Sequence, residues 1–288
     1  MLGQLVYLYL LSPLHTGGTT QEGNLLGIAR ESHTDLPYIP SSSIRGRLRS
    51  SIDTSGQDQI AQKLQKIQLF GSEIDDAKNE LLAERYEAVT GKKLNQLVQG
   101  DIWIGDGSIL WLPVPSLSHG VVWISSPLLL RRWARLARKD LEMSSDYSTS
   151  VGNQQPVYLK DAILKPSDLK AWESWKSFIP EGMQNQGIER VLVLPDKHCA
   201  TLIQMSLWRQ VKIKLDQHKT VDGGFRYEEA IPPDTLMYFP WGVIAQANGT
   251  GPASKSQFEA LMADHALLQI GGQESLGRGF VETCLASH

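Results

Sequence analysis

Cysteine is scarce in this chain, whose 288 residues contain only Cys199 and Cys284, far apart in the sequence. Neither has a histidine or a second cysteine at metal-ligand spacing, which excludes a disulfide framework and a common zinc site. Charge is limited too, with 20% charged residues and a net charge of −3. This balance argues against a surface that is basic throughout, although a basic groove can lie on an acidic body.

Long hydrophobic runs are also absent. The first segment, MLGQLVYLYLLSPLHTGG, is apolar over about a dozen residues, which is too short to span a bilayer. It lacks the basic flank and the small-residue cleavage site of a secretory signal. We therefore expect a cytoplasmic protein with no membrane partner. The β-branched and aromatic residues of 4–14 predict a central strand.

The usual phosphate-binding loops of nucleotide enzymes are missing. The stretch GGQESLGRGF comes nearest, because Gly272 and Gly277 have the Walker spacing. Arg278 and Gly279 stand where that loop needs Lys and then Ser or Thr, and the GxGxxG pattern also fails. A small-molecule nucleotide enzyme is therefore the least favoured class. Two interpretations stay open: N–H groups and Arg278 bind phosphates, or the glycines form a turn with positive φ.

Helical and strand patterns mix irregularly along the chain. Ile44 and Leu48 recur at a four-residue step in SSSIRGRLRSSID, which predicts a helix that Ser41, Ser42 or Ser43 can cap. Further helices are expected within 58–99, 127–139, 196–208 and 257–268, strands at 101–116, 120–126, 191–195, 211–216 and 280–286, and loops at 15–35, 144–190 and 249–256. Because regular βαβ alternation is absent, the pattern predicts an α+β fold, and the length allows one large domain or two small ones.

The segment 211–229 predicts a hairpin with two unlike faces, since apolar Val211 and Ile213 alternate with lysines. The basic and polar members are Lys212, Lys214, His218 and Lys219, and the aromatic ones are Phe225 and Tyr227. Such a hairpin could place cations against phosphates and a ring between bases. Outward lysines are also common on ordinary hairpins, and this second interpretation is favoured on the local pattern alone.

Candidate catalytic side chains are few. His15 follows the first strand and could act as a general base on a phosphodiester, although a lone histidine is more often structural. The carboxylates of the first loop are Glu22 and Glu31, and we expect Glu31 to pair with a cation rather than to bind a metal. A magnesium-assisted nuclease needs an acidic ligand near the scissile phosphate.

Four arginines from three separated segments could form a phosphate-binding surface. They are Arg30, the pair Arg45 and Arg49 at i and i+4, and Arg278. If these segments converge in the fold, each guanidinium offers a bidentate fork to a phosphate. The alternative is a set of scattered surface salt bridges.

Six fragments, taken in order, carry a resemblance to a known family. They are HTGG (15–18), RESHTDLPYIPSSSIRGRLR (30–49), LFG (69–71), PVPSLSHGVVWISSPLLLR (113–131), YEEAIPPDTL (227–236) and QIGGQESLGRGF (269–280). Over residues 5–282 the chain resembles the RAMP superfamily (repeat-associated mysterious proteins). Within it, the chain is most similar to the backbone subunit of type III-B, Cmr-type CRISPR effector complexes.

The resemblance implies a single domain over 1–288 with a modified RRM-like (ferredoxin-like) antiparallel sheet. It also implies insertions at about 54–100 and 140–190 and a thumb hairpin at about 210–229. It implies copies stacked along a guide RNA, with thumbs that kink the guide–target duplex. The implied partners are guide RNA, target RNA, further copies and other complex subunits, and no cofactor is expected for binding. The implied RNA-binding residues are His15, Arg30, Ser42, Ser43, Arg45, Arg49, Lys212, Lys214, His218, Lys219, Phe225, Tyr227, Gly271, Gly272, Gly277, Arg278 and Gly279.

One departure from the family pattern concerns catalysis. Members that cut target RNA have an aspartate in a stretch like Asp-Leu-Pro-Ile-Gln-Arg-Glu, whereas this chain has LLGIARE, with Leu25 in the aspartate position. Asn24 beside it is neutral, and Glu22 would serve only if the loop shifts. We therefore expect RNA binding without cleavage. The alternative is an endoribonuclease that uses Mg²⁺ with a shifted carboxylate, or His15 without a metal to mature guide RNA.

Overall fold

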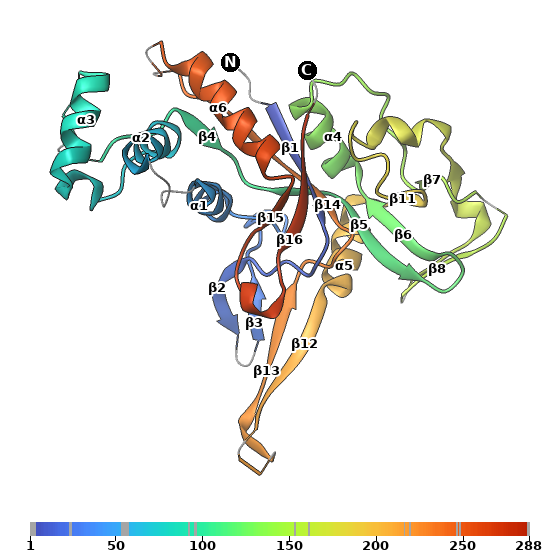
Figure 1. Ribbon diagram of the computed structural model, residues 1–288. Helices are drawn as coiled ribbons and strands as arrows, with labels where there is room; N and C mark the ends of the chain where they lie inside the picture. Colours follow the sequence, from blue (N-terminus) through green and yellow to red (C-terminus); the bar gives the residue numbers. More distant parts are fainter. Residues whose placement is uncertain are drawn as a thin grey trace.

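A large, mostly antiparallel sheet covered by helices forms the body of the molecule, and a smaller sheet projects from it (Figure 1). This arrangement confirms the predicted α+β class. The structure, a computed structural model, describes residues 4–286 except for 23–24, 53–57, 92, 95–96, 153, 161, 216, 219, 246 and 248. Across these residues no helix is long and apolar enough to cross a membrane.

The first strand occupies the centre of the large sheet. Strand β1 (Gln4–Leu10) pairs antiparallel with β14 (Leu236–Val243) on one side and with β16 (Phe280–Leu285) on the other. All of its residues except Gln4 are buried. The central strand predicted from the β-branched and aromatic residues is therefore confirmed.

The remaining strands extend this sheet on both sides of β1. Beyond β14 lie β5 (Ser108–Ser116), β6 (Gly120–Ser125), β11 (Val191–Val193), β7 (Ser148–Thr149) and β10 (Lys170–Ala171), and beyond β16 lies β15 (Leu267–Gln269). Strand β4 (Ile102–Ile104) pairs with β14, β8 (Val157–Leu159) pairs with β5, and β9 (Ala162–Leu164) pairs with β8. The predicted strands at 101–116, 120–126, 191–195 and 280–286 are thus present, with shorter bounds.

Helices lie against both faces of the large sheet. The helices are α1 (Ser41–Ser51), α2 (Gln59–Phe70), α3 (Glu80–Thr90), α4 (Pro127–Leu136), α5 (Asp196–Ser206) and α6 (Gly251–Asp264), with 3₁₀ turns η1 (Asp76–Lys78), η2 (Pro166–Asp168), η3 (Glu173–Phe178) and η4 (Glu274–Leu276). Helix α3 is the exception, because it packs on α2 away from the sheet. Because alternate residues of a strand face opposite ways, Val6 and Leu8 pack in a core with Phe258 of α6. Tyr7 packs on the other face in a core with Trp133 of α4.

Two helix starts differ from the sequence-based expectation. The N-cap of α1 is Pro40 and no serine side chain caps the helix. Instead, the Ser41 N–H donates to Asp106 Oδ1 at 2.7 Å, so the cap comes from a residue distant in sequence. Helix α6 begins at Gly251, inside the expected loop at 249–256. A proline in its first turn, which suits a helix N-terminus, explains the earlier start.

The smaller sheet joins two hairpins in the order β12-β13-β3-β2. Its strands are β2 (Gly17–Glu22), β3 (Leu25–Ile28), β12 (Trp208–Leu215) and β13 (Val221–Ala230). The predicted hairpin at 211–229 is confirmed and extends away from the body in Figure 1. The predicted loop at 15–35 is wrong over its first part, because β3 pairs in parallel with β13, a partner about 200 residues away that local patterns do not reveal.

Candidate nucleic-acid interface

One face of the β12–β13 hairpin is an exposed apolar stripe. Val211 lies opposite Tyr227 and Ile213 lies opposite Phe225, so these four side chains share one face. Each is between 41% and 51% exposed. The rings of Phe225 and Tyr227 meet edge to face with centroids 5.5 Å apart. Exposed contiguous apolar groups of this kind indicate a surface that meets a partner.

The other face of the hairpin is charged and organised around Glu228. This side chain is fully buried, and its carboxylate lies 2.8 Å from Lys212 Nζ, 3.0 Å from Arg226 Nη2 and 3.8 Å from Arg278 Nη2. Burial raises the pKa of Glu228, but the hydrogen bond and charge of Lys212, with help from Gln273 and Arg226, outweigh it and hold the pKa below its usual value. A single carboxylate therefore faces three cations.

Arg278 of the glycine-rich loop lies at the base of this hairpin and is only 3% exposed. Its Nη2 donates to Gln210 Oε1 at 2.8 Å, and its guanidinium carbon lies 4.1 Å from the Trp208 ring centroid. Burial lowers the pKa of Arg278, an effect that the nearby Glu228 charge opposes. Its Nη1 has no hydrogen-bond partner within the described residues. The guanidinium thus keeps an unused donor group.

The glycines of this loop form a turn with left-handed backbone. Gly271, Gly277 and Gly279 have φ of +83°, +72° and +76°, which favour glycine. A Cβ at Gly279 would clash with the Ile270 carbonyl oxygen. The interpretation of a turn that needs positive φ is therefore confirmed, and any contact with phosphates stays a prediction.

His15 is joined to both parts of this region. It is 5% exposed, and its Nδ1 lies 2.8 Å from the Glu229 carbonyl oxygen. Since a carbonyl only accepts, Nδ1 is the donor in this hydrogen bond. The His15 carbonyl accepts from the Gly272 N–H at 2.9 Å. His15 therefore links the first strand to the hairpin and to the glycine-rich turn.

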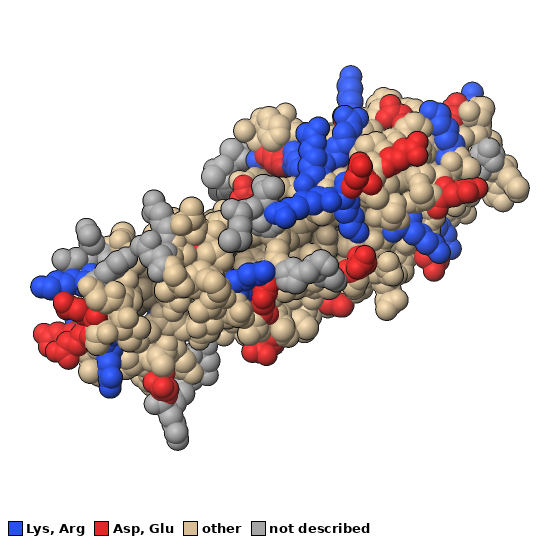
Figure 2. Space-filling view, turned by 90° about the horizontal axis from the view of Figure 1, so that it is seen from above, with Lys and Arg blue, Asp and Glu red and all other residues tan. Residues whose placement is uncertain are grey.

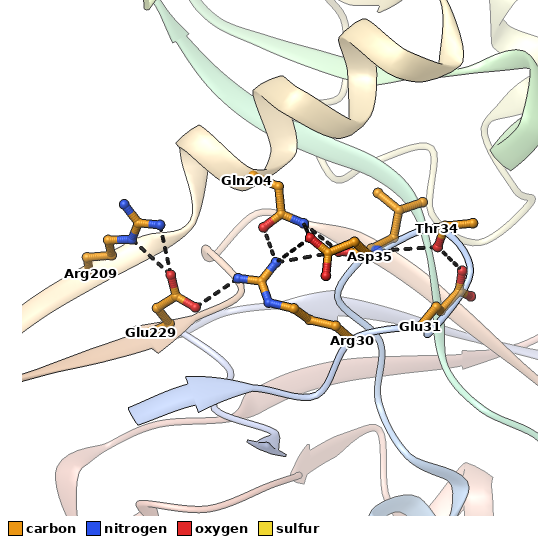
Figure 3. A network of polar contacts seen from close by, with 8 residues as sticks. Arg30, Glu31, Thr34, Asp35, Gln204, Arg209 and Glu229 are labelled. Atoms are coloured by element: carbon orange, nitrogen blue, oxygen red, sulfur yellow. Dashed lines mark hydrogen bonds and ion pairs between the residues drawn. The ribbon is translucent and has the colours of Figure 1, made fainter. Parts of the chain in front are cut away.

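Arg30 joins a second polar network around the neighbouring glutamate, Glu229 (Figure 3). Arg30 Nη2 lies 2.9 Å from Glu229 Oε2, and Arg209 Nε lies 2.9 Å from Glu229 Oε1. Arg30 also donates to Gln204, which in turn donates to Asp35. These residues line a cleft of about 590 Å³ beside β3. Consecutive glutamates in one strand thus hold cations on opposite faces of the hairpin base.

Glu31 is paired with a cation, as the sequence led us to expect. Both of its carboxylate oxygens accept from Arg132, at 2.5 Å and 3.2 Å, and Thr34 donates to Oε2 at 2.5 Å. Burial raises the pKa of Glu31, but the Arg132 and Thr34 hydrogen bonds outweigh this and lower it. This expectation is confirmed, with Arg132 as the cation.

Arg45 and Arg49 lie apart from the hairpin network and contact the end of α2. Arg45 donates to the carbonyl oxygens of Phe70 at 3.1 Å and Ile102 at 2.9 Å. Burial and then the nearby Arg49 charge lower the pKa of Arg45. Arg49 donates to the Gly71 carbonyl and lies 2.8 Å from Glu73 Oε1. Of the four arginines, only Arg30 and Arg278 therefore lie at the hairpin base, on opposite faces of it.

Other predicted site residues fall on the surface or outside the described residues. Ser42 is exposed and Ser43 is partly buried in the first turn of α1, and Lys214 and His218 are exposed on the hairpin. Asn24 and Lys219 lie outside the described residues, as does the side chain of Glu22. Within the described residues no three His, Cys, Asp or Glu side chains come close enough to hold a metal ion.

Sequence reasoning missed Glu228 and Glu229 as organising residues. The signal was present in YEEAIPPDTL, because two consecutive carboxylates in a strand point to opposite faces and need counter-charges on both. Trp208 and Gln210, which hold Arg278, carry no local signal. Their role depends on the glycine-rich turn folding onto the hairpin base.

Comparisons with known proteins agree with this architecture. Residues 7–282 match the sequence profile of the RAMP superfamily. The chain is 30% identical over 309 residues to the CRISPR system Cmr endoribonuclease Cmr4 of Pyrococcus furiosus, covering 99% of this chain and 96% of that protein. A crystal structure of oligomeric Cmr4 from Pyrococcus furiosus superposes with a TM-score of 0.65 at 23% identity, covering 99% of this chain and 97% of the other.

A second solved structure has the same fold. In the cryo-EM structure of Type III-B Cmr-beta bound to cognate target RNA, one chain superposes with a TM-score of 0.70 at 18% identity. The superposition covers 99% of this chain and 97% of that one. The fold with its large, mostly antiparallel sheet and its helices therefore matches known structures over nearly the whole chain.

Proposed function

The chain belongs to the RAMP superfamily, within which it is a relative of Cmr4, and we propose that it is an RNA-binding backbone subunit of a type III-B CRISPR effector complex. In this role it acts in the cytoplasm in antiviral defence. Its partners are a guide RNA, the complementary target RNA, further copies of itself and the other subunits of the complex. RNA binding needs no cofactor.

The two-faced hairpin is the observation that carries this proposal. Its charged face groups Lys212 and Arg226 with the buried Arg278 around one carboxylate, which leaves an excess of positive charge for phosphates. Its apolar face presents Phe225 and Tyr227, which suit stacking on bases or wedging between them. A hairpin with one charged and one apolar face can bind along the RNA backbone and kink a guide–target duplex.

The order of the central strands supports an RRM-like core. Strand β1, helix α1, strands β5 and β14, helix α6 and strand β16 occur along the chain in a βαββαβ order, with other elements between them. In the sheet they lie in the order β5-β14-β1-β16, the arrangement of a ferredoxin-like fold. In this scheme α2 and α3 and the segment 140–190 are insertions into a single domain.

We also propose that this subunit does not cut target RNA. Leu25 stands in the position where cleaving relatives have aspartate, and Glu31 is already engaged by Arg132. His15 is buried, with Nδ1 against a backbone carbonyl oxygen, which does not favour a mobile general base. Mg²⁺ would be required only if the subunit cut RNA with a displaced carboxylate, such as that of Glu22, as the metal ligand.

The test uses the purified chain assembled on guide RNA, with labelled complementary RNA and Mg²⁺. We expect the RNA to be bound and left intact, and periodic cuts that disappear in Glu22→Ala would contradict the catalytic part. Lys212→Ala with Lys214→Ala should weaken binding and reduce the salt dependence by about 0.7 per lost phosphate contact. The control Lys255→Ala, from a surface pair on α6, should change neither. If the salt dependence of RNA binding were unchanged in the double variant, the hairpin would not contact the RNA phosphates.

A further inference from the structure

A small cleft lies where two parallel strands of the large sheet end. Strands β6 and β11 pair in parallel, and each is followed directly by a helix, α4 after β6 and α5 after β11. The two helices leave towards opposite faces of the sheet, because Trp133 of α4 packs in the core that contains Tyr7, whereas Ile203 of α5 packs in the core that contains Val6. Such a divergence opens a crevice at the carboxyl ends of the strands, which is where open α/β sheets bind ligands.

This α4–α5 cleft has a volume of about 200 Å³ and a mainly apolar lining. The apolar side chains that line it are Leu36, Leu128, Leu129, Cys199 and Ala200. Asp196 is the one carboxylate among the lining residues, and its Oδ1 accepts from the Leu128 N–H at 2.9 Å. Leu128 is 38% exposed. The carboxylate is therefore engaged with the start of α4, while apolar surface stays open to a ligand.

Cations lie along the rim of the α4–α5 cleft. Lys197 lines the cleft from α5, and Arg131 and Arg135 follow Leu128 on successive turns of α4. All three are exposed, and none has an ion-pair partner within the described residues. The view from above in Figure 2 shows Lys and Arg side chains gathered over the part of the molecule where α4 lies. A ligand of this cleft therefore meets positive charge next to apolar surface.

We propose that the α4–α5 cleft docks an acidic segment of another protein through one bulky apolar side chain. The apolar side chain enters between the two helix starts, and carboxylates on either side of it pair with Arg131 and Lys197. Small-molecule ligands occupy larger pockets, of about 300 Å³ or more. RNA bases stack on aromatic rings, and none of the described residues that line this cleft is aromatic. An acidic peptide with an apolar anchor fits both the lining and the charge.

The cleft borders the loop that carries Arg30, although it is separate from the apolar stripe of the hairpin. Thr34 lines the cleft and donates to Glu31, and the neighbouring Asp35 accepts from Gln204 of α5. Docking therefore covers residues 34–36 and the first turn of α5 and leaves the β12–β13 hairpin open. The inference goes beyond the proposed function, because docking of a protein segment here does not require RNA.

The test measures binding of a dye-labelled peptide, Glu-Glu-Leu-Glu-Glu, to the full chain by fluorescence anisotropy. Replacing its leucine by alanine should weaken binding about tenfold or more, because the buried apolar surface of leucine is lost. Replacing its glutamates by glutamines should also weaken binding and remove its salt dependence. In hydrogen exchange, the Leu peptide should protect amides within 34–36 and 196–200.

Variants of the chain test each part of the cleft. Arg131→Glu with Lys197→Glu should weaken binding of the acidic peptide about tenfold and allow Lys-Lys-Leu-Lys-Lys to bind instead. Leu128→Gln should reduce the affinity for the leucine peptide to that for the alanine peptide. Arg190→Glu, an exposed arginine that does not line the cleft, is the control and should change neither peptide affinity. Urea unfolding checks that each variant folds, and RNA affinity should stay unchanged in the double variant.

Other outcomes would overturn the inference. Absence of saturable binding, or equal binding of the leucine and alanine peptides, would mean that the cleft takes no apolar anchor. A loss of RNA affinity in the double variant would mean that Arg131 and Lys197 bind RNA. If sedimentation showed self-association of the unchanged chain that the double variant lacks, the occupant would be a second copy instead of an acidic segment of another protein. Because the peptide titration contains no RNA, failure of the proposed function would leave its result interpretable.

Discussion

Replacing Glu228 by glutamine should destabilise the hairpin base while strengthening RNA binding. Glutamine keeps the size and an acceptor oxygen of the side chain but removes the negative charge that faces three cations. Lys212 Nζ at 2.8 Å and Arg226 Nη2 at 3.0 Å then lose their counter-charge. The two effects have opposite signs, which makes the variant informative.

The expected loss of stability follows from the geometry. At 2.8 Å and an effective dielectric constant of about 20, the Lys212–Glu228 attraction is about 6 kcal/mol before desolvation. Burial of the carboxylate offsets most of this. Lys212 and Arg226 are 26% and 60% exposed, so water can solvate them once the charge is gone. We therefore expect the free energy of unfolding to fall by about 2 kcal/mol at neutral pH.

The pH dependence has a definite sign. Because the pKa of Glu228 in the folded chain lies below 4.5, its ionised form stabilises the fold above pH 4.5. This contribution is lost as the pH falls through the pKa that Glu228 has in the folded chain. There the Glu228 carboxylate becomes protonated and neutral, like the glutamine of the variant. The difference between Glu228→Gln and the unchanged chain should therefore be largest near neutrality and shrink in acid.

Urea unfolding, together with hydrogen exchange of the β12 and β13 amides, measures this loss at neutral and acidic pH. In Glu259→Gln, the control on α6, a carboxylate 3.7 Å from Lys255 loses its charge. It should lower the free energy of unfolding by less than about 1 kcal/mol. RNA titrations of Glu228→Gln should show tighter binding and a steeper salt dependence. An equal loss of stability at both pH values, or an unchanged salt dependence, would refute this reasoning.

Three further predictions concern the turn, the α1 cap and the apolar stripe. Gly279→Ala should lower the free energy of unfolding by more than about 3 kcal/mol, whereas Gly277→Ala, which meets open space, should cost about 1 kcal/mol; urea unfolding compares them. Asp106→Ala should cost about 1 kcal/mol by the same assay, because the Ser41 N–H loses its acceptor, and no loss would show that water replaces it. Phe225→Ala should weaken RNA binding by about 1–3 kcal/mol in anisotropy titrations with little loss of stability, and an unchanged affinity would remove this ring from the interface.

The elements that the sequence predicted well are those with a local period. Alternating apolar residues marked the hairpin, and the step from Ile44 to Leu48 marked α1, whose two residues are buried. The start of α4 was also predictable, because Ser126 precedes Pro127 in the sequence. In the structure the Ser126 side chain accepts from the Leu129 N–H. In each case neighbouring residues alone determine the local conformation.

The features that were missed depend on contacts between distant segments. Strand β3 is short and only partly buried, and its pairing with β13 defines it as a strand. The two carbonyl oxygens that accept from Arg45 belong to Phe70 and Ile102, and nothing in the residues next to Arg45 predicts these contacts. The approach of Arg278 to Glu228 depends on the glycine-rich turn folding onto the hairpin base. Such non-local contacts leave no periodic trace in the sequence.

The central position of β1 has a consequence for biosynthesis. Its two neighbours, β14 and β16, are made from residues 236–243 and 280–285, so both are translated long after β1. The apolar strand β1 therefore leaves the ribosome long before its partners exist, and the sheet closes around it only after residues 280–285 have emerged. Folding of this kind is slow because distant segments must find each other. Newly made chains should depend on chaperones until release, and removing the last strand should leave β1 exposed and prone to aggregate.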